Sequence, residues 1–313
     1  LNPNDGEDRW RLANFLLRQG DQGGAVDEIA AAVRLEPRLA EPGVALLLKS
    51  GVAADRVEGL LPDDRAAQTR LFRSLISLSR RAASLPAVSD GSEAVLGVLW
   101  SRLLGDEPPL TVSEGRPYVD NLLCAGRAVE AREAWIRLNG ANGNSDPQFE
   151  SGSNRVWNGN FELEPAGHPL GWQVGQSDAF EGSRDAKGGE GQSAALLVEF
   201  LGTENLSFAH VSQQLVLEPG VSYRLKLSVR TEALTTDQGV FVEVISRDPG
   251  GLLVASQPVV GSTDWVVTEL SFTTPESSGQ ATIRLRRRPS QQIDNRIRGK
   301  VWLDSVGVEQ VTP

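Results

Sequence analysis

An aspartate interrupts an apolar strand pattern near the end of the chain. The segment GKVWLDSVGVEQV, residues 299–311, is rich in Val, Trp and Leu, and Asp304 lies in its middle. A buried carboxylate costs free energy unless hydrogen-bond donors, a cation or a metal ion compensate it. We therefore expect Asp304 to have a partner, which is a set of backbone donors, an arginine or a metal ion.

Basic residues form a second set that could bind a ligand. In the segments at residues 281–288 and 221–232 they recur at every second position, so they project from one face of each strand. These residues are Arg284, Arg286, Arg288, Arg224, Lys226 and Arg230. Guanidinium groups bind carboxylates through two parallel hydrogen bonds, so a sheet holding both strands would carry a basic face suited to an acidic glycan. The alternative is a solvated face balanced by acids such as Glu243 and Glu269.

Aromatic side chains are the third group, because the apolar face of a sugar ring can pack on them. Tyr223 shares a strand face with apolar residues, and Trp172 and Trp302 are also expected in the core. Trp157 and Phe241 are less constrained and remain candidates for ligand contact. The sequence shows no row of exposed aromatics.

The composition excludes several classes of protein. A formal net charge of -10 over 313 residues argues against a nucleic-acid-binding protein. The one cysteine, Cys124, excludes an intramolecular disulfide framework and a multi-cysteine zinc site, and its apolar helical surroundings predict that it is buried. No stretch reaches the roughly 20 apolar residues of a membrane span. The sequence starts at Leu1 without a signal segment, so we expect any export signal or anchor to lie outside it.

Two halves with different periodicity must position these residues. Up to about residue 139, apolar residues recur at every third or fourth position, which predicts helices. From about residue 156, period-two segments at residues 221–232, 239–248, 264–275 and 281–288 predict strands. The Asn-, Gly- and Ser-rich stretch between them is predicted to be a linker. The expected organisation is a helical domain at residues 1–140, a linker at 141–154 and a strand domain at 155–313.

The helical half resembles tetratricopeptide repeats. Residues 9–37 match that pattern at Leu12, Ala13, Gly20, Ala25, Ala32 and Pro37, although Trp10 lies one position later than the usual aromatic. Residues 118–138 match again at Gly126, Ala131 and Trp135. The resemblance implies a protein partner bound on the repeat surface. The alternative is that these helices serve as a spacer.

The strand half resembles the jelly-roll carbohydrate-binding modules of families 4, 9 and 22. The motifs NGNFE, GW, LEPGVSY, DW, FTTP and VWLDSV occur in the family's order between residues 156 and 311. The resemblance implies an antiparallel β-sandwich that binds a polysaccharide or oligosaccharide. It also implies a structural calcium ion held by Glu162, Asp304 and backbone carbonyls near Asn160 and Lys187. Pairing of the first and last strands is expected to bring the two acids together.

These expectations combine into a non-catalytic adaptor, with helices binding a protein partner and a jelly roll binding a glycan. The sequence shows no Ser-His-Asp grouping and no phosphate-binding loop, and its two histidines are not at metal-ligand spacing. We therefore predict that the chain is not an enzyme. The resemblance suggests an exported, periplasmic or cell-surface protein in bacterial envelope polysaccharide assembly or secretion. The alternatives are an assembly protein whose jelly roll binds no sugar, and an accessory region of a glycoside hydrolase.

Overall fold

The protein is described by a computed structural model that covers residues 2, 4–81, 86–247, 251–293 and 295–311. The chain forms two compact units, Leu1–Gly143 and Asn144–Pro313. Asp248, at the end of an expected strand, lies outside the described residues. Residues 1, 3, 82–85, 249–250, 294 and 312–313 of the predicted domains also lie outside them. Each unit is described separately.

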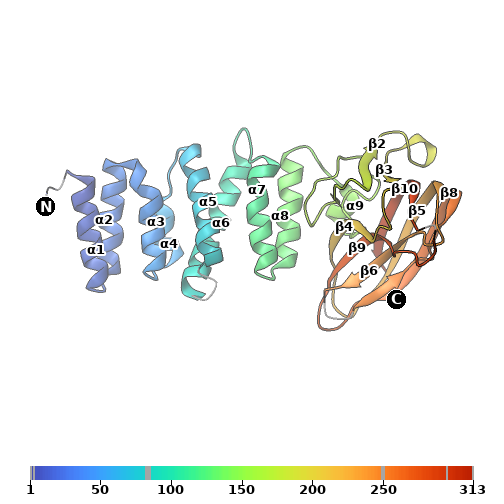
Figure 1. Ribbon diagram of the computed structural model, residues 1–313. Coiled ribbons are helices and arrows are strands. Elements are labelled where there is room, and N and C mark those ends of the chain that lie inside the picture. Colours follow the sequence, from blue (N-terminus) through green and yellow to red (C-terminus); the bar gives the residue numbers. More distant parts are fainter. Residues whose placement is uncertain (1, 3, 82–85, 248–250, 294, 312–313) are drawn as a thin grey trace. The chain divides into compact units, whose positions relative to one another are not determined.

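The first unit is helical, as its periodicity predicts. Its elements are α1 (Gly6–Arg18), α2 (Gln22–Leu35), α3 (Ala40–Lys49), α4 (Ala54–Val57), α5 (Arg65–Arg81), α6 (Pro86–Gly105), α7 (Val112–Cys124) and α8 (Ala128–Ala141), with short 3₁₀ turns at Pro37–Leu39 and Glu58–Leu60. Within this unit, α1 packs on α2, α5 on α6 and α7 on α8, so helical hairpins follow one another along the chain (Figure 1).

The helix pair at residues 9–37 follows directly from local sequence signals. Asp5 caps the start of α1 by accepting hydrogen bonds from the backbone N–H groups of Glu7 and Asp8. Gly20 then takes a φ of 80° in the turn, a conformation that glycine adopts without steric cost. The small residues at the contact, Ala13, Ala25 and Ala32, are fully buried. The expected helix–turn–helix is present, and its assignment to a named repeat type stays a prediction.

The second predicted pair, α7 and α8, is also present. Thr111 and Glu114 form a reciprocal capping box at the start of α7, and Trp135 of α8 is fully buried. The expected burial of Cys124 is wrong: this thiol is exposed. Cys124 is the last residue of α7, where its neighbours Leu122 and Leu123 occupy the buried positions.

Part of the predicted linker belongs to the second unit. Residues 147–151 form the short helix α9 (Pro147–Ser151), and Phe149 of this helix packs edge-on against Trp157 with ring centroids 5.4 Å apart. The buried Asn154 accepts hydrogen bonds from the backbone N–H groups of Val156 and Val308 and donates to the Val306 carbonyl. Composition suggested a linker, yet these polar side chains are used to attach the segment to the strands.

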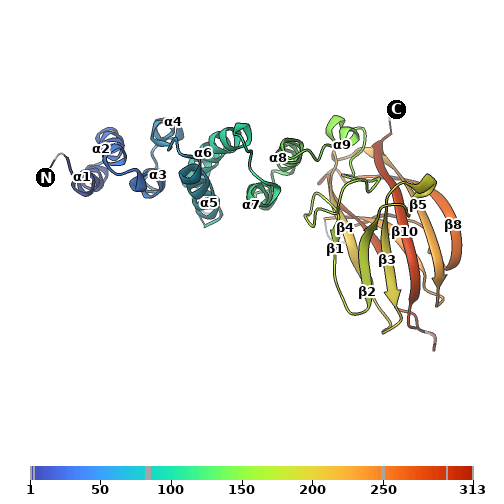
Figure 2. The same ribbon diagram turned by 90° about the horizontal axis from the view of Figure 1, so that it is seen from above.

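The second unit is an antiparallel β-sandwich, which confirms the predicted fold class (Figures 1 and 2). We call the first sheet sheet A. Its strands, in order, are β1 (Gln173–Val174), β4 (Phe208–Val216), β9 (Gln280–Arg287), β6 (Val240–Ser246) and β7 (Leu252–Ala255). Sheet B contains, in order, β2 (Phe180–Asp185), β3 (Ala195–Leu201), β10 (Arg298–Gln310), β5 (Ser222–Leu234) and β8 (Gly261–Thr273).

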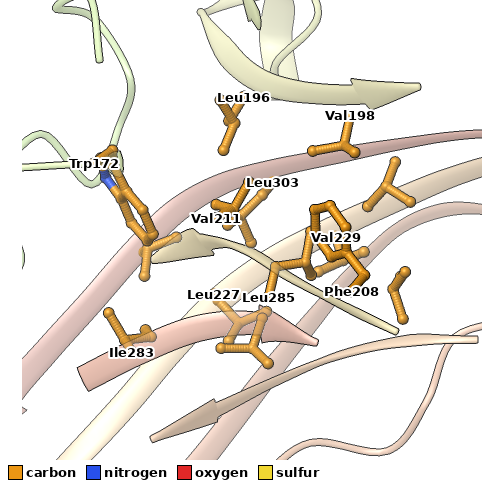
Figure 3. Packing of buried hydrophobic residues seen from close by; sticks show 14 of the residues in the cluster. Trp172, Leu196, Val198, Phe208, Val211, Leu227, Val229, Ile283, Leu285 and Leu303 are labelled. Atoms are coloured by element: carbon orange, nitrogen blue, oxygen red, sulfur yellow. The ribbon is translucent and has the colours of Figure 1, made fainter. Parts of the chain in front are cut away.

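The two sheets enclose one apolar core. Figure 3 shows Leu303 and Val229 of sheet B packed toward Leu285 and Val211 of sheet A, with Trp172 at one side. Tyr223 is fully buried as expected, and its hydroxyl accepts a hydrogen bond from the Glu218 backbone N–H at 2.9 Å. Since core residues occupy alternate positions of each strand, the residues between them lie on the outer face of each sheet.

Candidate functional site

The six predicted basic residues do not form one face. Arg224, Lys226 and Arg230 lie on β5 of sheet B, whereas Arg284 and Arg286 lie on β9 of sheet A, followed by Arg288. Their side chains project outward from opposite sides of the sandwich, as the two-residue period requires. The expectation of a shared sheet is therefore wrong, because the period determines a residue's face and not its partner strand.

On the outer face of sheet A, polar residues are aligned across three strands. Register places Ser212 of β4, Arg284 of β9 and Glu243 of β6 in one row. Nε and Nη2 of Arg284 both lie 2.5 Å from Oε1 of Glu243, whose residue is only 4% exposed. The side chain of Arg284 keeps 30% of its surface exposed. Glu243 thus fixes a guanidinium that still reaches solvent.

Arg286 extends this row along β9. Its Nη1 donates to the Ser207 hydroxyl at 3.0 Å and to the Phe208 carbonyl at 2.8 Å. The guanidinium of Arg288 lies over the Phe241 ring, 5.4 Å from its centroid. Phe241 itself is only 7% exposed, so its ring is not an open platform for a sugar.

The outer face of sheet B combines cations with indole rings. Lys226 pairs with Glu269 at 3.5 Å. Arg230 lies over two tryptophan rings, 4.0 Å from the centroid of Trp302 and 5.4 Å from that of Trp265. Trp302 is 6% exposed, and it is buried on the outer face of the sheet rather than in the core between the sheets.

Trp157 does not present a ring face to a ligand. It is 2% exposed and packs against Phe149 of α9. Its backbone N–H donates to Oε1 of the buried Gln213 at 2.7 Å, and the Gln213 side chain donates back to the Trp157 carbonyl. Trp157 therefore anchors the first segment of the sandwich to β4.

Asp304 is buried on the outer side of sheet B, beneath the loop that leads into β3. Its Oδ2 accepts hydrogen bonds from the Glu190 backbone N–H at 3.3 Å and the Ser193 hydroxyl at 3.2 Å, and its Oδ1 accepts from the Ser305 N–H at 2.6 Å. The carboxyl is 2% exposed, and burial raises its pKa, with the charge of Glu162 adding to the rise. Backbone and hydroxyl donors thus satisfy part of this group.

The predicted metal ligands occupy different environments around Asp304. The charge of Glu162 contributes to the raised pKa of Asp304. Glu162 itself lies outside any strand. The segment that leads to Glu162 forms no strand, so β10 has its strand partners in β3 and β5. The backbone of that segment nevertheless bonds to the last strand, since the Arg155 N–H donates to the Val308 carbonyl and the Val306 N–H donates to the Gly159 carbonyl, both at 2.8 Å. Asn160 is exposed, and its side-chain carbonyl accepts from the Glu162 N–H at 3.5 Å. Lys187 is also exposed, and its N–H donates to Asp185.

The donors at this position suit a hard cation. Glu162 lies close enough for its charge to raise the pKa of Asp304, and Ca²⁺ prefers six to eight oxygen ligands. No group of three or more His, Cys, Asp or Glu side chains that could hold a metal occurs among the described residues. A calcium ion would therefore need carbonyl or water oxygens besides Glu162 and Asp304.

Arg287 is a buried residue whose role sequence reasoning missed. Its fully buried guanidinium donates to the carbonyls of Gln238, Leu206 and Asn295 and to the Asn205 side chain. Burial lowers its pKa. The available signal was its parity with core residues of β9, which places it on the inner face. Arg287 ties together three loops at one end of the sandwich.

The helical unit contains a groove of about 640 Å³ beside α2 and the start of α5. Val33, Leu60 and Leu61 contribute apolar surface, while Arg34 and Arg70 are exposed at its margin. In the described part of the chain, neither arginine makes an ion pair. A groove with an apolar lining and free cations can accommodate a segment that carries apolar and acidic residues.

Several solved structures are similar to the sandwich half of the chain. A family 4 carbohydrate-binding module is 17% identical, with a TM-score of 0.37, and the match covers 50% of this chain and 99% of that one. A family 16 module is 18% identical, with a TM-score of 0.35 and coverages of 50% and 99%. A family 22 xylan-binding domain from Paenibacillus barcinonensis is 15% identical, with a TM-score of 0.36 and coverages of 49% and 92%. Similarities this low do not indicate what the present sandwich binds.

Sequence comparisons add little. No family model matches the chain. A curated protein, the tRNA(Glu)-specific nuclease WapA of Bacillus subtilis subsp. natto, is 25% identical over 112 residues, which is 35% of this chain and 5% of that protein. The match is too short to establish a family or an activity.

The helices were also compared with the requirements of a membrane span. Among the described residues, none of them combines the length and apolar character that crossing a bilayer requires.

Proposed function

We propose that the protein is a non-catalytic adaptor whose β-sandwich binds a glycan. The observation that carries this proposal is the row of Ser212, Arg284 and Glu243 across the outer face of sheet A. Sugar hydroxyls both donate and accept hydrogen bonds, so a protein recognises them with fixed polar groups. A buried acid that holds a partly exposed arginine side chain supplies such preorganisation.

This face suits hydroxyl groups better than free carboxylates. Glu243 lies within 2.5 Å of Arg284 and 4.0 Å of Nε of Arg286, so one buried negative charge offsets part of the positive charge. The remaining N–H groups can still donate to neutral oxygens. The proposed ligand of sheet A is therefore a neutral oligosaccharide.

Binding of the full-length chain to a neutral glycan array, followed by calorimetric titration, tests this proposal. Ser212→Tyr should weaken binding about tenfold or more, because the larger side chain covers the row without entering the core. Arg284→Met should also weaken binding, since it removes the central donor. Arg224→Met, which removes a cation from the opposite sheet, is the matched control and should bind like the wild type.

Two results would contradict glycan binding by sheet A. The first is an array on which the folded wild-type chain retains no neutral glycan. The second is equal binding by the wild type and Ser212→Tyr, with thermal melting showing that both are folded. Either result would favour the alternative of an assembly protein whose sandwich binds no sugar.

We also propose that the helical unit binds a protein partner through the groove beside α2 and α5. Its apolar lining favours a segment with apolar residues, and Arg34 and Arg70, which make no ion pair with the described residues, favour acidic residues beside them. Asp63 and Asp64 also line the groove and would disfavour acids on their side. Cross-linking in the native host with the wild type and Arg70→Glu tests this. Identical cross-linked partners for both would leave the helices as a spacer.

An exported or cell-surface location is part of the proposal, because polysaccharide ligands of this kind occur outside the cytoplasm. Fractionation of the native host tests it, and a purely cytoplasmic distribution would contradict it. Calcium is proposed as a structural ion that Glu162 and Asp304 would hold, with no part in catalysis. It would add positive charge beside two acids, of which Glu162 already lies 3.7 Å from Nη2 of Arg184.

A further inference from the structure

Arg230 lies between two indole rings on the outer face of sheet B. Register places it directly opposite Trp302 of β10, and Trp265 belongs to β8 on the other side of β5. The guanidinium carbon is 4.0 Å from the Trp302 centroid and 5.4 Å from the Trp265 centroid. We call Trp302, Arg230 and Trp265 the indole clamp. Stacking of this kind occupies the flat faces of a guanidinium and leaves its in-plane N–H groups available.

Among the basic residues predicted for ligand binding, Arg230, Arg224 and Arg288 make no guanidinium hydrogen bond or ion pair within the described residues. Of these three, only Arg230 is flanked by two indole rings and partly buried, whereas Arg224 and Arg288 are exposed. Arg284 contacts Glu243, Lys226 contacts Glu269, and Arg286 donates to Ser207 and Phe208. Arg230 is a held cation whose five N–H donors have no acceptor among the described residues.

The carboxylate of Asp185 holds the Trp302 ring of the clamp in place. Nε1 of Trp302 donates to Oδ2 of Asp185 at 3.0 Å, while Oδ1 of Asp185 accepts from the Lys187 backbone N–H at 3.2 Å. These bonds orient the Trp302 ring against which Arg230 stacks. The hydrogen bond from Trp302 is the main cause that lowers the pKa of Asp185, and the charge of Arg230 contributes to the same shift. Asp185 thus influences Arg230 through its charge without forming an ion pair with it.

We propose that the indole clamp is a second ligand site, which binds the carboxylate of an acidic sugar. A carboxylate accepts two parallel hydrogen bonds from the edge of a guanidinium, and the partly exposed Trp265 ring offers apolar surface beside that edge for the sugar ring. A uronic acid carries both features in one residue. This inference extends the proposed glycan-binding function to the opposite sheet, where the ligand differs in charge.

The geometry also explains why the anion site belongs to sheet B. On sheet A, the buried Glu243 lies beside the arginines and would repel a second carboxylate. Asp185 is the corresponding acid near the clamp, and its hydrogen bonds from Trp302 and Lys187 offset its negative charge only in part. An incoming carboxylate would meet the free edge of Arg230. Glu199, Glu232 and Lys300 lie in the neighbouring row of sheet B, and Lys300 pairs with Glu199 at 3.6 Å.

The test compares two ligands that differ in one charge per sugar residue. The full-length chain is titrated calorimetrically with a galacturonic acid oligomer and with the same oligomer as its methyl ester. We expect the acid to bind more tightly and its affinity to fall as salt rises. Arg230→Lys keeps the charge but loses the planar pair of donors, so it should weaken binding of the acid about tenfold. Arg224→Lys, the same change on the same strand face outside the clamp, should leave binding unchanged.

Further variants separate this site from sheet A. Trp265→Leu removes one wall of the clamp, should also weaken binding of the acid, and provides a test if Arg230→Lys does not fold. Ser212→Tyr should weaken neutral-glycan binding and leave the acid unaffected. If no neutral glycan binds while Arg230-dependent binding of the acid persists, the sheet A proposal fails and the indole clamp stands.

Several outcomes would overturn the clamp proposal. Equal affinity for the acid and its methyl ester would show that the carboxylate is not recognised. Equal losses in Arg230→Lys and Arg224→Lys would show diffuse charge attraction. Absence of binding by either oligomer to the folded wild type would leave the stacked arginine as a support for Trp302 alone.

Discussion

Asp304 is a buried carboxylate whose hydrogen-bond donors are all neutral. Its carboxyl is 2% exposed, accepts three hydrogen bonds from neutral donors and has a raised pKa because of burial. Neutral donors compensate a buried negative charge only in part. The neighbouring Glu162 adds a second negative charge. A divalent cation at this position would stabilise both carboxylates and the loop that covers them.

Removal of calcium is therefore expected to destabilise the β-sandwich. Chelation of the metal-loaded chain should lower the melting temperature of the strand unit, because a ligand at 100 times its dissociation constant contributes about 2.7 kcal/mol. Asp304→Ala should abolish the difference between calcium-loaded and chelated samples. Glu181→Gln, on the exposed face of β2, is the control and should retain it. An unchanged melting temperature on chelation would refute the calcium proposal.

At the scale of single elements, α7 begins at a capping box that the unit uses for stability. Thr111 accepts from the Glu114 backbone N–H, and the Glu114 carboxylate accepts from the Thr111 N–H at 3.1 Å. That backbone hydrogen bond is the main cause that lowers the pKa of Glu114. The ionised carboxylate therefore stabilises the native helix above the ordinary pKa of glutamate, and this contribution is lost as pH falls through the lower native pKa.

Replacing these residues should change the stability of the helical unit in a predictable direction. Thr111→Ala should reduce the free energy of unfolding by about 1 kcal/mol, because two N–H groups lose their acceptors or their orientation. Glu114→Gln keeps the cap without an ionisable group, so its stability relative to the wild type should improve as pH falls below about 4.3. Urea denaturation at neutral and acidic pH measures both effects. A wild-type-minus-Glu114→Gln difference that does not depend on pH would contradict this role of the carboxylate.

On the scale of the whole molecule, the boundary of the second unit lies before α9. Phe149 packs on Trp157, Asp146 accepts from the Asn158 N–H, and Asn154 bridges to β10. The segment that composition marked as a linker thus covers one end of the sandwich. Its removal would expose Trp157 and leave backbone groups of β10 without their partners.

The fragment 144–313 should therefore fold alone with one cooperative transition. The shorter fragment 155–313 should be less stable by about 3 kcal/mol or more, because it lacks Asn154 and the Phe149 contact. Asn154→Ala in the longer fragment should reproduce a large part of that loss. Chemical denaturation of the three proteins gives the comparison. Equal stability of the two fragments would return residues 144–154 to the role of a linker.

Local sequence was sufficient to predict the elements and the faces of many residues. The helical period, Gly20 and Gly126 indicated the helix pairs, and the two-residue period indicated most strands and the buried position of Tyr223. The parity of β9 also contained the signal for Arg287, whose burial was not predicted. These properties depend on steric and hydrophobic preferences over a few neighbouring residues, which the sequence contains directly.

Only the tertiary structure decided which of these elements meet. Each sheet is built from strands that are not consecutive in the sequence. A local period therefore could not predict that β5 and β9 belong to opposite sheets of the sandwich. Trp157 bonds to Gln213 of β4, and the Phe241 ring lies beneath the guanidinium of Arg288, so both aromatics are held by residues distant in the sequence. The indole clamp likewise requires β10, β5 and β8 in register. Sequence alone therefore determined the residue types available for binding, and long-range packing decided which of them remain free to bind.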